Sequence, residues 1–145
     1  MPTNNGRTVV ADQTFSQRTG EQGTTVNSKY VIILEGAASP VQTNYTLDGD
    51  WTLIADWDPA TMGFLLIKNT QGQGTGYATV TRSTVNDANV IEVAVLPSSG
   101  TAFQDLGSWF VYPGEAMRGC PEADVYARVK SGTGEVTCTV TTFPK

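Results

Sequence analysis

The chain contains no histidine, and this absence removes the side chain most used for acid–base chemistry in proteins. Ser-His-Asp and Cys-His nucleophile pairs, and most catalytic zinc sites, all need a histidine. The two cysteines, Cys120 in "RGCP" and Cys138 in "VTCT", have neither the C-x-x-C spacing of a metal site nor an activating base beside them. We therefore expect a protein that is not an enzyme and has no catalytic residues, cofactor or metal site.

Positive charge is also scarce, which bears on the class of partner. Nine basic residues face 14 acidic ones, for a net charge of -5, and the basic residues are scattered from Arg7 to Lys145 without a cluster. Nucleic acids and anionic membrane surfaces both require concentrated positive charge. The longest apolar runs, such as 31–34 and 64–67, are about five times too short to span a bilayer. We expect neither nucleic acid nor a membrane as partner.

No apolar segment typical of an export signal follows the first residues, "MPTNNGRTVVADQTF", so we expect synthesis in the cytosol. A reducing cytosol favours free thiols, whereas an oxidising space would allow Cys120 and Cys138 to pair. Cys138 stands in phase with Val136 and Val140, which predicts that it faces inward.

A helical period is missing as well, and from Lys29 onward the apolar residues follow the two-residue period of strands. In "VIEVAVLP", Ile91, Val93 and Val95 share one face. In "NYTLDGDWTL", Asp48-Gly49 predicts a tight hairpin turn between two strands. "DVYARVK" and "EVTCTVTTF" both alternate, and residues 131–134 predict a second hairpin between them.

About seven or eight short strands of this kind predict an all-β fold, an antiparallel β-sandwich or jelly-roll-like single domain over residues 29–145. "GSWFVYPGE" supplies a further strand and a Pro-Gly turn. The glycines at 72, 74 and 76 do not form a dinucleotide fingerprint, because Tyr77 occupies the place of its third glycine and a strand-like segment follows.

Residues 1–28 differ in composition from residues 29–145, because they are rich in Thr, Asn, Gln and Gly and contain few apolar residues. Such a segment buries too little to repay its ordering entropy. It is predicted to be an extended N-terminal arm that orders against another surface or remains a floppy terminus.

Two further patterns allow a functional and a structural interpretation. Trp51, Trp57 and Trp109 could form a sugar-stacking platform, with Trp57 in "ADWDP" the most loop-like of the three, although tryptophans are more often core or interface residues. The acidic residues at 48, 50, 56 and 58 could hold calcium, but they lack the EF-hand spacing and are interpreted as loop carboxylates.

Residues 63–143 resemble the small β-rich virion proteins of tailed bacteriophages, especially the head decoration or cement proteins. The likeness rests on "GFLLIKNT", "YATVTR", "VIEVAVLPSSGTAFQDLG", "SWFVYPGE" and "VYARVKSGTGEVTCTVTTF". It implies a non-enzymatic protein made in the host cytoplasm that binds the assembled capsid shell, commonly as a trimer. Its partner would be the major capsid protein or another virion protein.

With that resemblance, the arm is expected to become ordered on assembly by adding a strand to a neighbouring sheet. Val9, Val10 and Phe15 are the expected anchors, and Arg7 and Arg18 the rim contacts. The alternative is a carbohydrate- or receptor-binding module of a phage fibre, tail or adhesin that uses Trp51 and Trp57. A glycan-active enzyme with an unidentified pair of acids is the third and weakest hypothesis.

Overall fold

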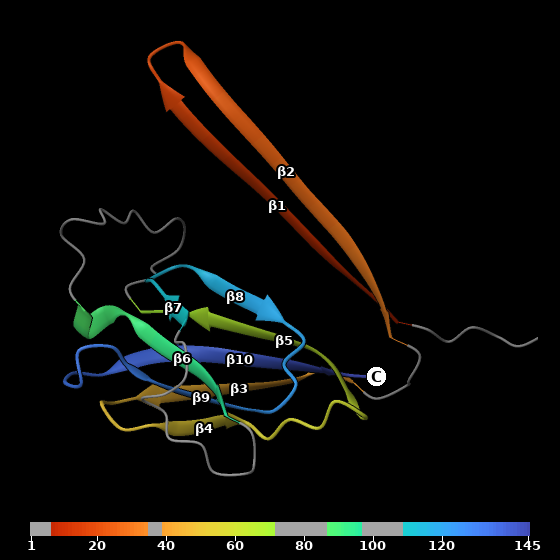
Figure 1. The fold of residues 1–145 in the computed structure, drawn as a ribbon, viewed down its shortest axis with the longest axis vertical. Helices are drawn as coiled ribbons and strands as arrows, with labels where there is room; N and C mark the ends of the chain where they lie inside the picture. The colour runs from red at the N-terminus through yellow and green to blue at the C-terminus, as the bar shows by residue number, and fades with distance from the viewer. Residues whose placement is uncertain (1–6, 35–38, 72–86, 97–108) are drawn as a thin grey trace, which may run out of the picture. The chain divides into compact units, whose positions relative to one another are not determined.

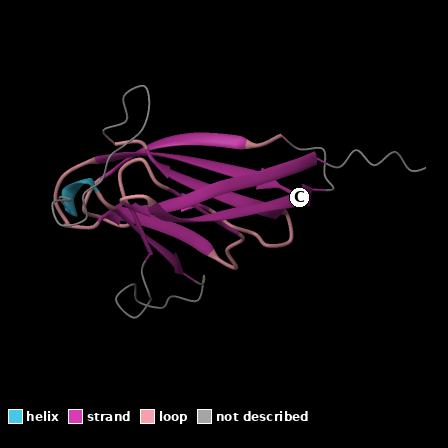
Figure 2. Ribbon diagram, turned by 90° about the horizontal axis from the view of Figure 1, so that it is seen from above, coloured by secondary structure: helices cyan, strands magenta, loops and turns pink. Residues whose placement is uncertain are grey.

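The computed structural model describes residues 7–34, 39–71, 87–96 and 109–145. Strands make up most of the described chain, and a short 3-10 turn is the helical element in these ranges (Figure 2). The chain divides into two compact units, residues 1–38 and residues 39–144.

The first unit is a long β-hairpin of two strands, β1 (Arg7–Thr19) and β2 (Gln22–Leu34), of 13 residues each (Figure 1). They pair antiparallel in unbroken register from Arg7↔Leu34 to Thr19↔Gln22. Gly20 begins the two-residue turn with φ at 63°, whereas Glu21 has no positive φ. This is the pattern of a type II′ turn, whose twist matches that of the strands it joins.

The division between the two units differs from the predicted one. The expected arm ended at residue 28, but β2 continues to Leu34 and the second unit begins at Ser39. The apolar run 31–34, expected in the sandwich, instead pairs with the start of β1. A strand period shows that a segment will pair but does not identify its partner strand.

The second unit contains eight strands and one 3-10 turn within the described residues. They are β3 (Val41–Leu47), β4 (Thr52–Ala55), β5 (Met62–Asn69), η1 (Asp87–Asn89), β6 (Ile91–Leu96), β7 (Trp109–Val111), β8 (Ala116–Gly119), β9 (Asp124–Val129) and β10 (Val136–Pro144).

These strands form two four-stranded antiparallel sheets with the orders β3-β10-β5-β8 and β4-β9-β6-β7. The first four strands, β3 to β6, pair with the last four in reverse order: β3 pairs with β10, β4 with β9, β5 with β8 and β6 with β7. A long strand ladder rolled up in this way is a jelly roll. The all-β sandwich prediction is therefore confirmed.

Both hairpins predicted within the sandwich are wrong. Strands β3 and β4, joined through Asp48-Gly49, lie in different sheets, and so do β9 and β10. Gly49 has no positive φ; instead, a Cβ atom there would overlap the carbonyl group of Gly132. The glycine is needed because two sheet-to-sheet corners pack back to back, not because a tight turn demands it.

The core lies between the two sheets and consists of alternating aliphatic residues. Cys138 is buried together with its in-phase neighbours Val136 and Val140, as predicted. Ile91 and Val93 are also buried, while Val95 is partly buried. Both cysteines are free thiols, Cys120 exposed and Cys138 buried.

The Pro-Gly turn after β7 is confirmed. The Glu115 N–H donates to the Tyr112 carbonyl over 2.9 Å, and Gly114 has φ at 79°. The predicted connection through the glycines at 72, 74 and 76 lies outside the described residues.

Asn69 at the end of β5 is the fully buried polar side chain of the described core. Its Nδ2 donates to the Asn89 and Val111 carbonyl oxygens, each over 2.9 Å. Its Oδ1 accepts from the Gln71 N–H over 3.0 Å. This amide joins β5 of one sheet to β7 of the other, so it fixes how the two sheets meet at this end of the sandwich.

Candidate functional site

The residues predicted as arm contacts all lie on β1. Val10 is exposed, and it pairs across the hairpin with Val31, which is exposed as well. The side chains of the other four, Arg7, Val9, Phe15 and Arg18, fall outside those that the structure describes. The structure thus places one of the expected anchors on an open surface of the hairpin.

Within the described residues, the hairpin forms a sheet of its own with β1 and β2 as its two edges. At about 3.4 Å per residue, strands of 13 residues extend for roughly 44 Å. Along each outer edge, alternate backbone N–H and C=O groups have no strand partner in this sheet. An edge of this length is a template for pairing with another strand.

Trp57, expected as a ligand-binding residue, is instead a core residue. It is only 5% exposed, and its backbone N–H donates to Asp124 Oδ1 over 2.9 Å. Its indole Nε1 is buried without a hydrogen-bond partner. The segment "ADWDP" has the composition of an exposed loop, but the hydrogen bond to Asp124 on β9 holds the chain after β4 against the core. Trp57 therefore cannot stack on a ligand in this fold.

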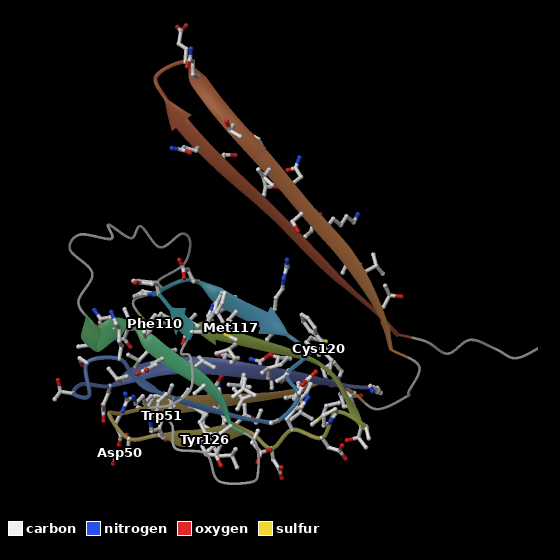
Figure 3. The ribbon with its side chains drawn as sticks, in the orientation of Figure 1. Asp50, Trp51, Phe110, Met117, Cys120 and Tyr126 are labelled. Carbon is white, nitrogen blue, oxygen red and sulfur yellow. The ribbon has the colours of Figure 1, made fainter. Side chains whose placement is uncertain are left out.

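Trp51 lies at the outer side of the β4-β9-β6-β7 sheet and is partly exposed (Figure 3). The Arg128 guanidinium carbon stands 4.4 Å from the centroid of the Trp51 ring. Arg128 Nε also contacts Glu92 Oε2 at 2.8 Å. One face of the indole ring is thus already covered by a cation that a carboxylate holds in place.

Further aromatic and basic side chains share this outer side. Lys130 Nζ lies 4.9 Å from the Phe110 ring centroid, and Phe110 and Leu53 are exposed. Tyr126 alternates with buried Val125 along β9 and pairs with Leu53 on β4. We call this surface the aromatic face; it consists of Trp51, Leu53, Glu92, Phe110, Tyr126, Arg128 and Lys130.

Sequence reasoning found only Trp51 of this face, although the alternation in "DVYARVK" contained the signal for more. Once the valines at 125 and 129 are assigned to the core, Tyr126, Arg128 and Lys130 must point to the other side. The contribution of Glu92 and Phe110 depends on which strands are neighbours, and the sequence does not carry that information.

The outer side of the β3-β10-β5-β8 sheet has a different chemistry. Thr139 Oγ1 donates to Asn44 Oδ1 over 2.9 Å, and Thr70 Oγ1 lies 3.1 Å from Thr137 Oγ1. We call the part of this side that β3 and β10 form the threonine face; it consists of Gln42, Asn44, Thr46, Thr137, Thr139 and Thr141. The exposed Lys68 of β5 pairs with Thr139 and borders this face. Hydroxyl and amide groups can hydrogen-bond to another protein surface without the cost of desolvating ions.

An apolar pocket of about 190 Å³ opens beside β8. Its lining comes from both sheets: Leu65, Ile67, Val95, Met117, Arg118, Gly119, Cys120, Pro121 and Val125. The exposed Cys120 at its rim donates its S–H to the Gly63 carbonyl over 2.9 Å. Apart from Arg118 and the Cys120 thiol, the lining is apolar, so the pocket suits an aliphatic side chain.

The acidic loop residues serve local turns. Asp48 Oδ1 accepts from the Asp50 N–H, and Asp58 Oδ1 from the Ala60 N–H, each over 2.9 Å. Among the described residues, no group of three or more His, Cys, Asp or Glu side chains is placed to hold a metal ion. None of the helices in the part of the chain described here is long and apolar enough to cross a bilayer.

Comparison with known proteins returned no relative of this chain: no family model matches it, and neither a curated protein nor a solved structure was found to be similar. The physical features of the hairpin, the two sheet faces and the pocket therefore carry the functional argument.

Proposed function

We propose that this chain is a non-enzymatic structural protein of a bacteriophage particle, most specifically a capsid decoration protein that attaches to the head through the β1–β2 hairpin. The observation that supports this function best is the hairpin itself, a 13-residue ribbon in a sheet of two strands. The proposed partner is the major capsid protein or another virion protein, and the proposed location is the outside of a capsid assembled in the host cytoplasm.

The physical reason is that a two-stranded hairpin is marginally stable in water by itself. Its side-chain hydrogen bonds are exposed, such as Thr14 Oγ1 to Asn27 Oδ1 at 3.1 Å, and add little. A third strand on either edge would pair about half of the 13 residues along that edge. Each added backbone bond contributes roughly 0.5–1.5 kcal/mol, so an edge contact is a substantial source of affinity.

The threonine face offers a second contact surface for a polar capsid exterior. On a symmetric shell, many weak contacts of this kind become collectively strong. We propose three copies at each site, which is what the resemblance drawn from the sequence of residues 63–143 implies.

Co-sedimentation with assembled shells of the major capsid protein from the same genome tests this function. The full chain should sediment with the shells, and a variant without residues 1–38 should not. The truncated protein should keep the melting temperature of the sandwich, since residues 39–144 form their own compact unit. Equal sedimentation of both proteins would refute the role of the hairpin, and no sedimentation of either would refute the decoration function.

The aromatic face supports a second candidate, a carbohydrate- or receptor-binding module. Partly exposed Trp51 and Tyr126 lie on one side of a sheet next to polar and charged groups, a combination suited to sugar rings. Against this, Arg128 already covers one face of Trp51. Glycan-array binding that is lost in both Trp51→Ala and Tyr126→Ala, while the chain without residues 1–38 still binds, would favour this candidate over capsid attachment.

A further inference from the structure

The hairpin and the apolar pocket complement each other in chemistry. The hairpin offers unpaired strand edges and three exposed valines, Val10, Val26 and Val31. The pocket lies beside β8, which is an edge strand that pairs with β5 alone among the strands of the described residues. We propose that the hairpin of one copy of this chain docks on the β8 edge of a second copy and places an aliphatic side chain in the pocket.

The edge of β8 provides the backbone half of this contact. A strand that pairs with a free sheet edge gains main-chain hydrogen bonds, and its alternate side chains enter neighbouring pockets. Gly119, the last residue of β8, lines the pocket, and a Cβ atom built there meets nothing within 4 Å. An incoming side chain therefore finds open space at the end of β8.

The pocket provides the apolar half. Its volume of about 190 Å³ is somewhat larger than a cavity of about 150 Å³ that takes up benzene, so it has room for a valine or isoleucine side chain. Leu65, Ile67 and Val125 line it and are themselves buried. Filling it removes apolar surface from water and restores contacts that the lining residues lack.

The length of the hairpin indicates a second copy as the occupant. Each hairpin strand has 13 residues, whereas the longest strand in the described part of the sandwich, β10, has nine and β8 has four. A ribbon this long extends beyond any one sheet edge of the sandwich. It is suited to reach from its own sandwich to a neighbouring one, as in exchange of an identical element between protomers.

Register within the sandwich supports an exchange of hairpins between copies. Val41, the first residue of β3, pairs with Thr142, which pairs with Leu65, which pairs with Gly119. The chain therefore enters the sandwich at the same end of the sheet at which the pocket lies. Residues 35–40, six in number, can span about 20 Å. Copies that meet at this end can each send a hairpin to the pocket of the next one around a closed ring.

The inference deepens the proposed role of the hairpin, but it fails independently of that role. The hairpin has two outer edges, so pairing with another copy occupies one and leaves the other for a shell protein. Shell co-sedimentation tests the hairpin against the capsid, whereas the experiment below uses the purified chain alone.

Cys120 makes docking measurable, because it is an exposed thiol at the pocket rim. Cys138 does not compete in the labelling, since it is buried and its pKa is raised to about 11 by burial. The protein is labelled with a thiol reagent at several protein concentrations, and light scattering gives its mass at each one. The mass should rise to a multiple of 15.5 kDa as labelling of Cys120 slows by about tenfold or more.

The matched variants are Gly119→Leu, which fills the pocket from within, and Gly119→Ala, which leaves most of it open. We expect Gly119→Leu to keep its melting temperature, to remain a monomer and to label at one rate at every concentration, while Gly119→Ala behaves as the parent chain. The inference is overturned by a parent chain that stays monomeric, by an oligomer in which Cys120 labels as fast as in the monomer, or by Gly119→Leu forming the same oligomer.

Discussion

Replacing Asn69 with alanine is the most direct test of how the two sheets are held together. The side chain makes three hydrogen bonds while it is fully buried: two from Nδ2 to the Asn89 and Val111 carbonyl oxygens and one from the Gln71 N–H to Oδ1. Alanine removes all three and leaves the Val111 carbonyl without this donor in a buried position.

The expected loss follows from these contacts. Three bonds at roughly 1 kcal/mol each give about 3 kcal/mol, and a buried carbonyl that loses a donor adds up to roughly 1 kcal/mol. We therefore expect Asn69→Ala to lower the free energy of unfolding by about 3–4 kcal/mol, a large part of the roughly 5–15 kcal/mol that stabilises a typical domain.

Urea denaturation of the full chain measures this difference, and an unchanged m-value would show that the same surface unfolds in both proteins. Asn44→Ala is the matched control, since its amide accepts a bond from Thr139 at the exposed threonine face. That substitution should cost about 0.5 kcal/mol or less. A loss below about 1 kcal/mol for Asn69→Ala would refute the view that this amide fastens β5 to β7.

Three further substitutions test other parts of the sandwich. Burial raises the pKa of Cys138 to about 11 from an ordinary value near 9, so the thiol loses its proton at lower pH in the unfolded chain than in the folded one. As pH rises from 8 to 10.5, the free energy of unfolding should therefore fall by about 2 kcal/mol more in the parent chain than in Cys138→Ala. Urea denaturation at each pH measures this difference. Gly49→Ala should lower the free energy of unfolding by about 1–3 kcal/mol, because its methyl group overlaps Gly132, whereas Gly119→Ala should change it by less than about 0.5 kcal/mol; equal melting curves would contradict the packed corners. Trp57→Ala should lower the free energy of unfolding by about 3–5 kcal/mol, because it empties a buried position. If the variant kept the stability of the parent chain but lost glycan binding, Trp57 would be a ligand contact after all.

The sequence predicts which segments form strands and which side chains face inward, because alternation is a local property. Cys138 with its neighbouring valines, and Ile91 with Val93, were placed correctly for this reason. The Pro-Gly turn after β7 is local in the same way, since one proline and one glycine determine it.

Partner choice is not local, and this is where the predictions failed. The segments on either side of Asp48-Gly49 read as a hairpin, yet β3 pairs with β10 and β4 with β9, far along the chain. In a jelly roll, the strands that follow one another mostly change sheets, so a turn signal marks a corner as readily as a hairpin. The hydrophobic pattern is the same in both cases, and only the register between distant strands distinguishes them.

The same limit explains why the candidate sites had to come from the structure. The aromatic face joins Trp51 to Arg128 and Glu92, and the pocket joins Leu65 to Val125, through neighbours that lie in different parts of the chain. The hairpin is the opposite case, since its register is local and follows from a single two-residue turn. A ribbon of two 13-residue strands is marginally stable in water, so we expect it to gain stability from contact with another surface. That surface can be the β8 edge of a second copy, a capsid subunit, or both, with one on each hairpin edge. Thiol labelling detects the first contact and shell sedimentation detects the second.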